Sequence, residues 1–321
     1  MRAAQPGETC IRRTQHGRKC CPHVSGPASR ILAFALEILD FGPPEISNSI
    51  DWGHSVASRP TFDTNVPMRL GRILIFPVKS LDGIELDEVA ITRGGILAND
   101  RIYAIFDEQG RVVNGKRTAV LHALRCEFDA GFKEIRFWKC DAPVQFCLDA
   151  PSAINRWLSE FFGFSVVLRH DPTAGFPDDR TAYGPTIVSD ASLLAVQDWF
   201  PELNIESVRR RFRTNLELAG GKPFWEDKLY GAPEELKAFR IGDVNFLGHN
   251  PCQRCVVPTR DPLSGDALSG FQKKFMEMRK QMLPQWANAE RFNHYYRLAV
   301  NTSIPVGEVG KKLHVGDPVV L

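Results

Sequence analysis

The chain has 321 residues, which is long for one domain and compatible with two. Its formal net charge of +2 is too small to predict a nucleic-acid or membrane-surface protein. Eight irregularly spaced cysteines exclude the disulfide framework of a small secreted domain, and no apolar run reaches the length that crosses a bilayer. These features predict a soluble cytoplasmic protein with reduced thiols.

Residues 1–67 are expected to form a poorly ordered extension outside the fold. Residues 1–30 carry six arginines and lysines against one acid, Glu8, which fits a targeting leader or an extension from an early start codon. Residues 42–67 are rich in turn formers and predict little order.

Residues 68–185 predict a first β-rich domain, because short strand-like segments recur there at a spacing typical of a barrel or curled sheet. The expected strands are 69–78, a hairpin of 101–106 with 111–113, and 121–128, 134–138 and 144–148. A helix is expected over residues 152–162, whose apolar side chains lie on one side.

Residues 186–321 predict a second β-rich domain. Ser189 is placed to cap a helix that runs to Phe200, and residues 209–218 predict a strand on which Arg213 and Asn215 face the same side. The other expected elements are a hairpin of 239–241 with 244–247 across a type I′ turn, a helix over 271–283, a strand over 295–302 and a final pair of short strands. The predicted fold class is α+β, mainly β, with two packed β-barrel-like domains and a few peripheral helices.

The most informative motif is Cys252-Gln253-Arg254-Cys255. It follows an apolar strand-like segment and precedes a cluster of turn residues, which predicts a loop at a strand end. A neighbouring guanidinium favours the thiolate, which is a soft metal ligand. Half a zinc site is disfavoured because Cys255 is the last cysteine, and Pro258 disfavours a helical redox pair. Two buried, inert cysteines remain an open alternative.

Candidate anion contacts are spread along the chain, and each has an ordinary structural alternative. Lys79 and Ser80 occupy a turn after a strand, where they predict either an anion contact or a solvated lysine. Arg101 could clamp a phosphate or pair with a carboxylate of its own domain. Arg213 and Asn215 suit phosphate recognition or an internal ion pair. The signatures of P-loop and dinucleotide-binding proteins are absent from the sequence.

The order of these signals resembles that of a known family. The matching segments are Ile75–Ser80, Asp100-Arg101, Ser189–Leu193, Arg211–Asn215, Glu226-Asp227, Cys252–Cys255 and Gly316–Val319. From Met68 to Leu321 the sequence resembles the MOSC family, with the barrel domain that commonly precedes the MOSC domain. It is similar to the two-domain members related to the mitochondrial amidoxime reducing component and its bacterial relatives.

The resemblance implies a molybdenum cofactor. It implies that Cys255 is the metal ligand and the catalytic residue, while the role of Cys252 stays open. The residues that would hold the pterin and its phosphate are Lys79, Ser80, Arg101, Arg213 and Asn215, and the nearby Ser189 and Ser192 would also bind the cofactor. One departure is Thr214, which stands where the family usually has proline and is expected to relax the backbone slightly.

The activity implied by the resemblance is the reduction of small N-hydroxylated compounds by oxygen-atom removal. Electrons would come from a separate ferredoxin-like or cytochrome b5-like protein. Two alternatives belong to other classes: a persulfide carrier for cofactor sulfuration, and a non-redox binding module for a phosphorylated cofactor such as pyridoxal phosphate.

Overall fold

The computed structural model describes residues 67–139, 142–179 and 181–321, all within one compact unit. This part of the chain contains fifteen strands, four α-helices and five short 3-10 helices. The α+β, mainly β, class is therefore confirmed. Apart from Pro67, the predicted N-terminal extension lies outside the described residues.

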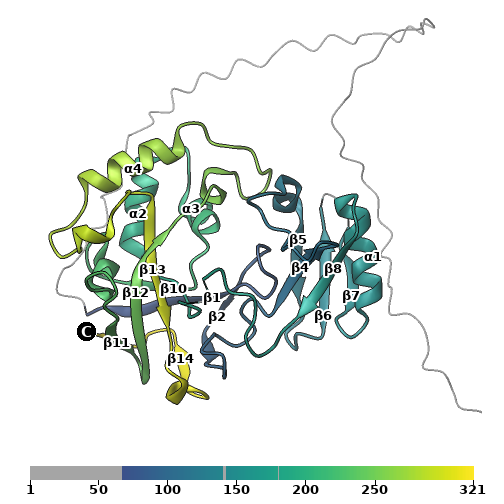
Figure 1. Ribbon diagram of the computed structural model, residues 1–321, viewed down its shortest axis with the longest axis horizontal. Coiled ribbons are helices and arrows are strands. Elements are labelled where there is room, and N and C mark those ends of the chain that lie inside the picture. The colour runs from purple at the N-terminus through teal and green to yellow at the C-terminus, as the bar shows by residue number, and fades with distance from the viewer. Residues whose placement is uncertain (1–66, 140–141, 180) are drawn as a thin grey trace, which may run out of the picture. The chain divides into compact units, whose positions relative to one another are not determined.

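The main structural element is an eight-stranded mixed sheet in the order β15-β11-β12-β13-β9-β10-β1-β2 (Figure 1). Its strands are β1 (Arg69–Ile75), β2 (Ile84–Leu86), β9 (Ile187–Ser189), β10 (Leu216–Ala219), β11 (Lys237–Ile241), β12 (Val244–Gln253), β13 (Arg297–Ser303) and β15 (Val319–Val320). No pairing between β2 and β15 closes this sheet, so it is not a closed barrel. Because β1 and β2 join strands from beyond residue 186, the boundary proposed near residue 185 does not separate two sheets.

A second group of strands packs around its own apolar core. It contains β4 (Tyr103–Asp107) with β8 (Val166–His170), and the meander of β5 (Arg125–Phe128), β6 (Glu134–Trp138) and β7 (Val144–Cys147). Helix α1 (Pro151–Phe162) contacts β7 and β8 and buries Ile154, Leu158 and Phe162 in this core (Figure 1). A separate pair joins β3 (Glu88–Ala90) to β14 (Lys312–His314).

The other three α-helices lie together beside the large sheet (Figure 1). They are α2 (Asp190–Trp199), α3 (Ile205–Phe212) and α4 (Phe271–Gln281). The predicted cap of α2 is confirmed, because the Ser189 side chain accepts from the Ser192 backbone N–H. The 3-10 helices are η1 (Ala119–Ala123), η2 (Trp225–Leu229), η3 (Val257–Thr259), η4 (Ala289–Arg291) and η5 (Val306–Glu308).

The predicted strand over residues 209–218 is wrong in its first half. Helix α3 continues to Phe212, and Asn204 caps it by accepting from the Ser207 backbone N–H at 2.8 Å. Arg213 then takes a left-handed conformation, with φ 52° and ψ 52°. Arg213 and Asn215 therefore do not share a strand face, and only β10 beyond them is extended.

Three smaller expectations are also corrected. The segment predicted as a strand from residue 121 begins as η1, and only β5 from Arg125 onward is extended. The two-residue turn after β11 has a positive φ only at Gly242, whereas a type I′ turn needs it at both central positions. Residues 111–113 make only a single bridge to β4, whose main partner is β8.

Candidate functional site

The described residues line a cleft of about 1090 Å³. Loops after β1, around η1, between α3 and β10 and after β12 form its walls, so distant parts of the sequence meet there. Its lining includes thirteen arginines and lysines but only six aspartates and glutamates, although the whole chain carries a net charge of only +2. A surplus of positive charge concentrated in a cleft attracts an anionic ligand.

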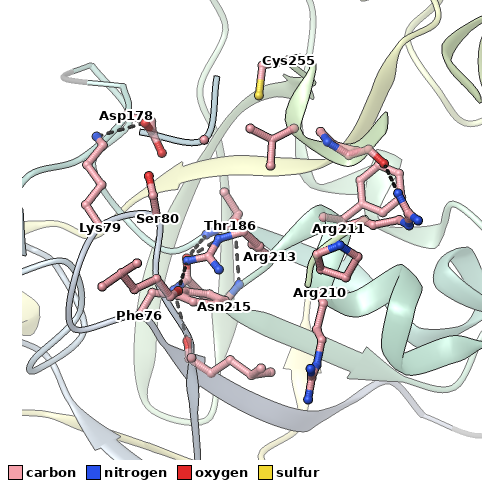
Figure 2. A pocket seen from close by; sticks show the side chains of 18 of the residues that line it. Phe76, Lys79, Ser80, Asp178, Thr186, Arg210, Arg211, Arg213, Asn215 and Cys255 are labelled. Atoms are coloured by element: carbon pink, nitrogen blue, oxygen red, sulfur yellow. Dashed lines mark hydrogen bonds and ion pairs between the residues drawn. The ribbon is translucent and has the colours of Figure 1, made fainter. Parts of the chain in front are cut away.

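Lys79 and Ser80 form one corner of this cleft (Figure 2). Lys79 is buried, and its ammonium donates to the carbonyls of Phe176 and Pro177 at 2.8 and 3.0 Å and pairs with Asp178 at 2.9 Å. Burial lowers the pKa of Lys79, while Asp178 acts in the opposite direction. The alternative of a solvated turn lysine is therefore wrong.

Arg101 is held by a buried polar chain. Its Nε donates to Asp100 at 2.7 Å, and the other oxygen of Asp100 accepts from the amide of Asn215 at 3.1 Å. The same amide also donates to a carbonyl of β1, and its oxygen accepts from the Thr186 backbone N–H, both at 3.1 Å. Asn215 is only 2% exposed, so its hydrogen-bonding groups are used inside the protein. In this geometry it positions Arg101 through Asp100.

Arg213 projects from the end of α3 into the same cleft (Figure 2). Its guanidinium lies 4.2 Å from the ring centre of Phe76, and Nη2 donates to the Leu81 carbonyl at 2.5 Å. Burial lowers the pKa of Arg213, and nearby carboxylates oppose that shift.

Backbone strain is concentrated at this site. Ser80, Arg101 and Arg213 have φ values of 72°, 53° and 52°, and they are three of the eight non-glycine residues with positive φ in the described part of the chain. Such conformations cost free energy and are enriched at ligand-binding sites, where the surrounding structure enforces them.

Cys252 and Cys255 both line the cleft and are only partly buried. Cys252 lies at the end of β12, and Arg254 Nη1 lies 3.0 Å from its sulfur. Cys255 follows in the loop, and its thiol points toward the space that the Ser80 hydroxyl also faces (Figure 2). The alternative of two inert, buried cysteines does not fit this placement. The arginine of the motif contacts the first cysteine, which the sequence did not indicate.

Ser189 and Ser192 do not line the cleft, and their assignment as cofactor contacts is corrected. Both are fully buried, and their hydroxyls donate to one oxygen of Glu226 at 2.7 and 2.8 Å. Ser192 also accepts from the Phe224 backbone N–H. The N-terminus of α2 points these side chains into the protein interior, where they join α2 to η2.

Several lining residues were not found from the sequence. Asp178 fixes Lys79 from a loop without a motif, and His122 reaches the cleft from η1. Arg260 and Arg297 add positive charge from segments distant in sequence, and each has a buried Nε without a hydrogen-bond partner in the described structure. A basic run at Arg209–Arg211 was the one local signal that could have extended the predicted site.

The fold and cleft define a mainly β protein whose two sequence segments share one cationic, thiol-bearing site. Residues 68–133 match the model of the MOSC N-terminal beta barrel domain, and residues 183–320 match that of the MOSC domain. The chain therefore belongs to the MOSC family.

Curated relatives carry two different names. The chain is 24% identical over 283 residues to human mitochondrial amidoxime-reducing component 1, covering 74% of this chain and 81% of that protein. It is 25% identical over 220 residues to molybdenum cofactor sulfurase of Drosophila mojavensis and 26% identical over 221 residues to that of Drosophila erecta. Those matches cover 58% of this chain but only 27% of each sulfurase.

The described residues contain neither a membrane-spanning helix nor a ready-made metal site. None of their helices combines the length and apolarity needed to span a bilayer. Nor do they contain a cluster of three or more histidine, cysteine, aspartate or glutamate side chains suited to holding a metal ion. The cytoplasmic location stays a prediction.

Proposed function

We propose that this protein is a molybdenum-cofactor-dependent oxidoreductase that reduces small N-hydroxylated compounds. The observation that carries the proposal is the meeting of the Cys255 thiol with Arg101 and Arg213 in one cleft. A human relative is named for amidoxime reduction, and others are named for molybdenum cofactor sulfuration. The second name refers to the molybdenum cofactor, which the family resemblance of the sequence also implies.

The residues of the cleft fit such a cofactor. The cleft has a volume of about 1090 Å³, which is sufficient for a pterin of drug-like size, since ligand pockets are typically about 300–1,000 Å³. Guanidinium groups bind phosphate through paired hydrogen bonds, and a thiolate is a ligand that soft metal centres prefer. We assign Cys255 to the metal, and Arg101, Arg213 and Ser80 to the pterin and its phosphate. Lys79 contributes charge at the cleft wall, and Asn215 keeps Arg101 in place.

When bound, the cofactor would supply a two-electron redox centre able to accept an oxygen atom. The overall reaction breaks the N–O bond, consumes two electrons and two protons, and releases the amine and water. The protein would contribute a thiolate that tunes the metal and cations that orient the cofactor. The electrons would come from a separate ferredoxin-like or cytochrome b5-like protein.

Purified variants test this assignment. Cys255→Ala should keep the fold but lose turnover of phenylhydroxylamine at least about 100-fold, because the ligand that tunes the metal is missing. Arg213→Ala should lose molybdenum content. Cys252→Ala is the matched thiol control and should retain molybdenum. Full activity in Cys255→Ala would contradict the proposal.

A second function has one observation in its favour. Cys252 shares the cleft and contacts Arg254, so a persulfide on this residue would face the same ligand. Such a sulfur carrier would release sulfane sulfur on cyanolysis and contain no stoichiometric molybdenum. Loss of that sulfur in Cys252→Ala, with wild-type levels in Cys255→Ala, would favour this alternative.

A further inference from the structure

His122 occupies a space that two glycines leave open. A Cβ added to Gly115 would lie 2.8 Å from His122 Nε2 and 3.5 Å from a methyl group of Val257. A Cβ at Gly265 would lie 3.4 Å from the Cβ of His122. Gly115 has no positive φ, so its lack of a side chain is explained by the imidazole rather than by its backbone.

This imidazole stands where the two family segments meet. His122 belongs to η1 within the segment that matches the N-terminal barrel, whereas Val257 and Gly265 belong to the MOSC segment. Val257 follows Cys255 by two positions, and both line the cleft together with His122. The histidine therefore lines the same cleft as Cys255 and lies close to the segment that follows the cysteine loop.

The ring retains hydrogen-bonding capacity toward the cleft. Nε2 lies 3.4 Å from the Gly115 carbonyl, which is longer than a strong hydrogen bond. Nδ1 has no partner among the described residues, and it is not one of their fully buried unpaired atoms. One ring nitrogen can therefore exchange a proton with a ligand or with water.

We propose that His122 donates a proton to the substrate hydroxyl oxygen as the N–O bond breaks. This inference rests on the proposed function, in which two protons convert that oxygen to water. His122 is the one histidine among the described lining residues, and imidazole carries protons most readily near neutral pH. The reducing electrons come through the metal centre from the donor protein, so His122 supplies only a proton.

Other ionisable groups of the cleft suit this role less well. Burial raises the pKa of Cys126 to about 12, and the pKa of Asp178 is lowered in its pair with Lys79, against the effect of burial. Burial, together with Arg260 and Arg213, lowers the pKa of His122, while the Gly115 carbonyl and Asp261 oppose that shift. The imidazolium is therefore lost at a lower pH than in an ordinary histidine, and proton donation should weaken as pH rises through the acidic side of the ordinary histidine range.

The experiment uses the molybdenum-loaded protein with its electron source. His122→Gln should lower kcat/KM for phenylhydroxylamine about 100-fold at pH 6 and flatten its fall with rising pH. Gly115→Ala should reproduce the defect by displacing the ring, and the double variant His122→Gln/Gly115→Ala should lose little more. His170→Gln, at the exposed end of β8, is the matched control and should behave as wild type.

A second measurement does not depend on turnover. The imidazole proton resonance missing from His122→Gln identifies His122 in the oxidised wild-type protein. That resonance should shift when phenylhydroxylamine is added, and the shift should disappear in Gly115→Ala.

Three results would overturn the inference. The first is a wild-type pH profile of kcat/KM in His122→Gln. The second is a loss of activity in His122→Gln that is fully explained by lost molybdenum or by unfolding. The third is an imidazole resonance of His122 that does not shift when phenylhydroxylamine is added. A wild-type protein without molybdenum or turnover would instead overturn the proposed function and the inference with it. Normal turnover in both wild type and His122→Gln would overturn the inference alone.

Discussion

Asn215 shows how a residue chosen for ligand binding can act through another. Its amide is buried and makes hydrogen bonds to Asp100, to Thr186 and to β1. Asp100 in turn holds Arg101. The family resemblance implied a direct cofactor contact, but the geometry supports a positioning role.

Replacing this residue should therefore affect stability before it affects ligand binding. Asn215→Ala leaves several buried polar groups unpaired and should lower the free energy of unfolding by about 2–4 kcal/mol. Urea denaturation of the cofactor-free protein measures this. Asn301→Ala removes a single hydrogen bond at a half-buried site and should cost less than about 1 kcal/mol. If Asn215→Ala kept the unfolding midpoint of the wild type but lost its molybdenum, the positioning role would be wrong and Asn215 would contact the cofactor directly.

At the scale of elements, the end of α3 combines backbone strain with function. Arg213 is the left-handed C-terminal cap of this helix, a position that glycine usually occupies. Arg213→Gly and Arg213→Ala remove the same guanidinium, but only glycine relieves the strained backbone. The glycine variant should be more stable than the alanine variant by about 1 kcal/mol, and both should lose molybdenum. Thermal unfolding and metal analysis check this, and a more stable alanine variant would contradict it.

The buried contact between α2 and η2 predicts a pH dependence of stability. Burial and the neighbouring Asp227 raise the pKa of Glu226 to about 7, from an ordinary value of 4.5. The folded protein thus binds this proton more tightly than the unfolded chain. The resulting stabilisation is complete below about pH 4.5 and is lost as pH rises through about 7.

Glu226→Gln should remove that dependence. Relative to wild type, the variant should gain stability as pH rises from 5 to 8, by up to roughly 3 kcal/mol. Unfolding midpoints across this range measure the difference, with the exposed Glu202→Gln as control. A constant difference between Glu226→Gln and wild type at all pH values would show that Glu226 does not titrate as described.

Elements with a strong local pattern were predictable, and those decided by tertiary contacts were not. The strand of β6, helix α1 and the Ser189 cap follow from periodicity and capping chemistry. Helix α3 was not predicted although Ile205, Val208 and Phe212 have helical spacing, because the two-residue separation of Arg213 and Asn215 is typical of one face of a strand. The inward direction of Ser189 depends on how α2 packs, and no local pattern specifies that.

At the scale of the whole molecule, the site exists only because the chain brings distant segments together. Lys79, Arg101, Arg213 and Cys255 belong to four separate loops, and their spacing in the sequence does not indicate proximity. Family resemblance supplied the grouping, while the structure supplied the strained backbones and the Arg254–Cys252 contact. His122 belongs to none of the motifs in the sequence, so only the three-dimensional packing reveals it.

The most direct test is the molybdenum and pterin content of the purified protein from a molybdenum-replete host. Wild type should contain both in matching, near-stoichiometric amounts, and a folded Arg101→Ala/Arg213→Ala variant should contain neither. A folded wild-type protein with no molybdenum above the level of that double variant would contradict the assignment of this cleft to the cofactor.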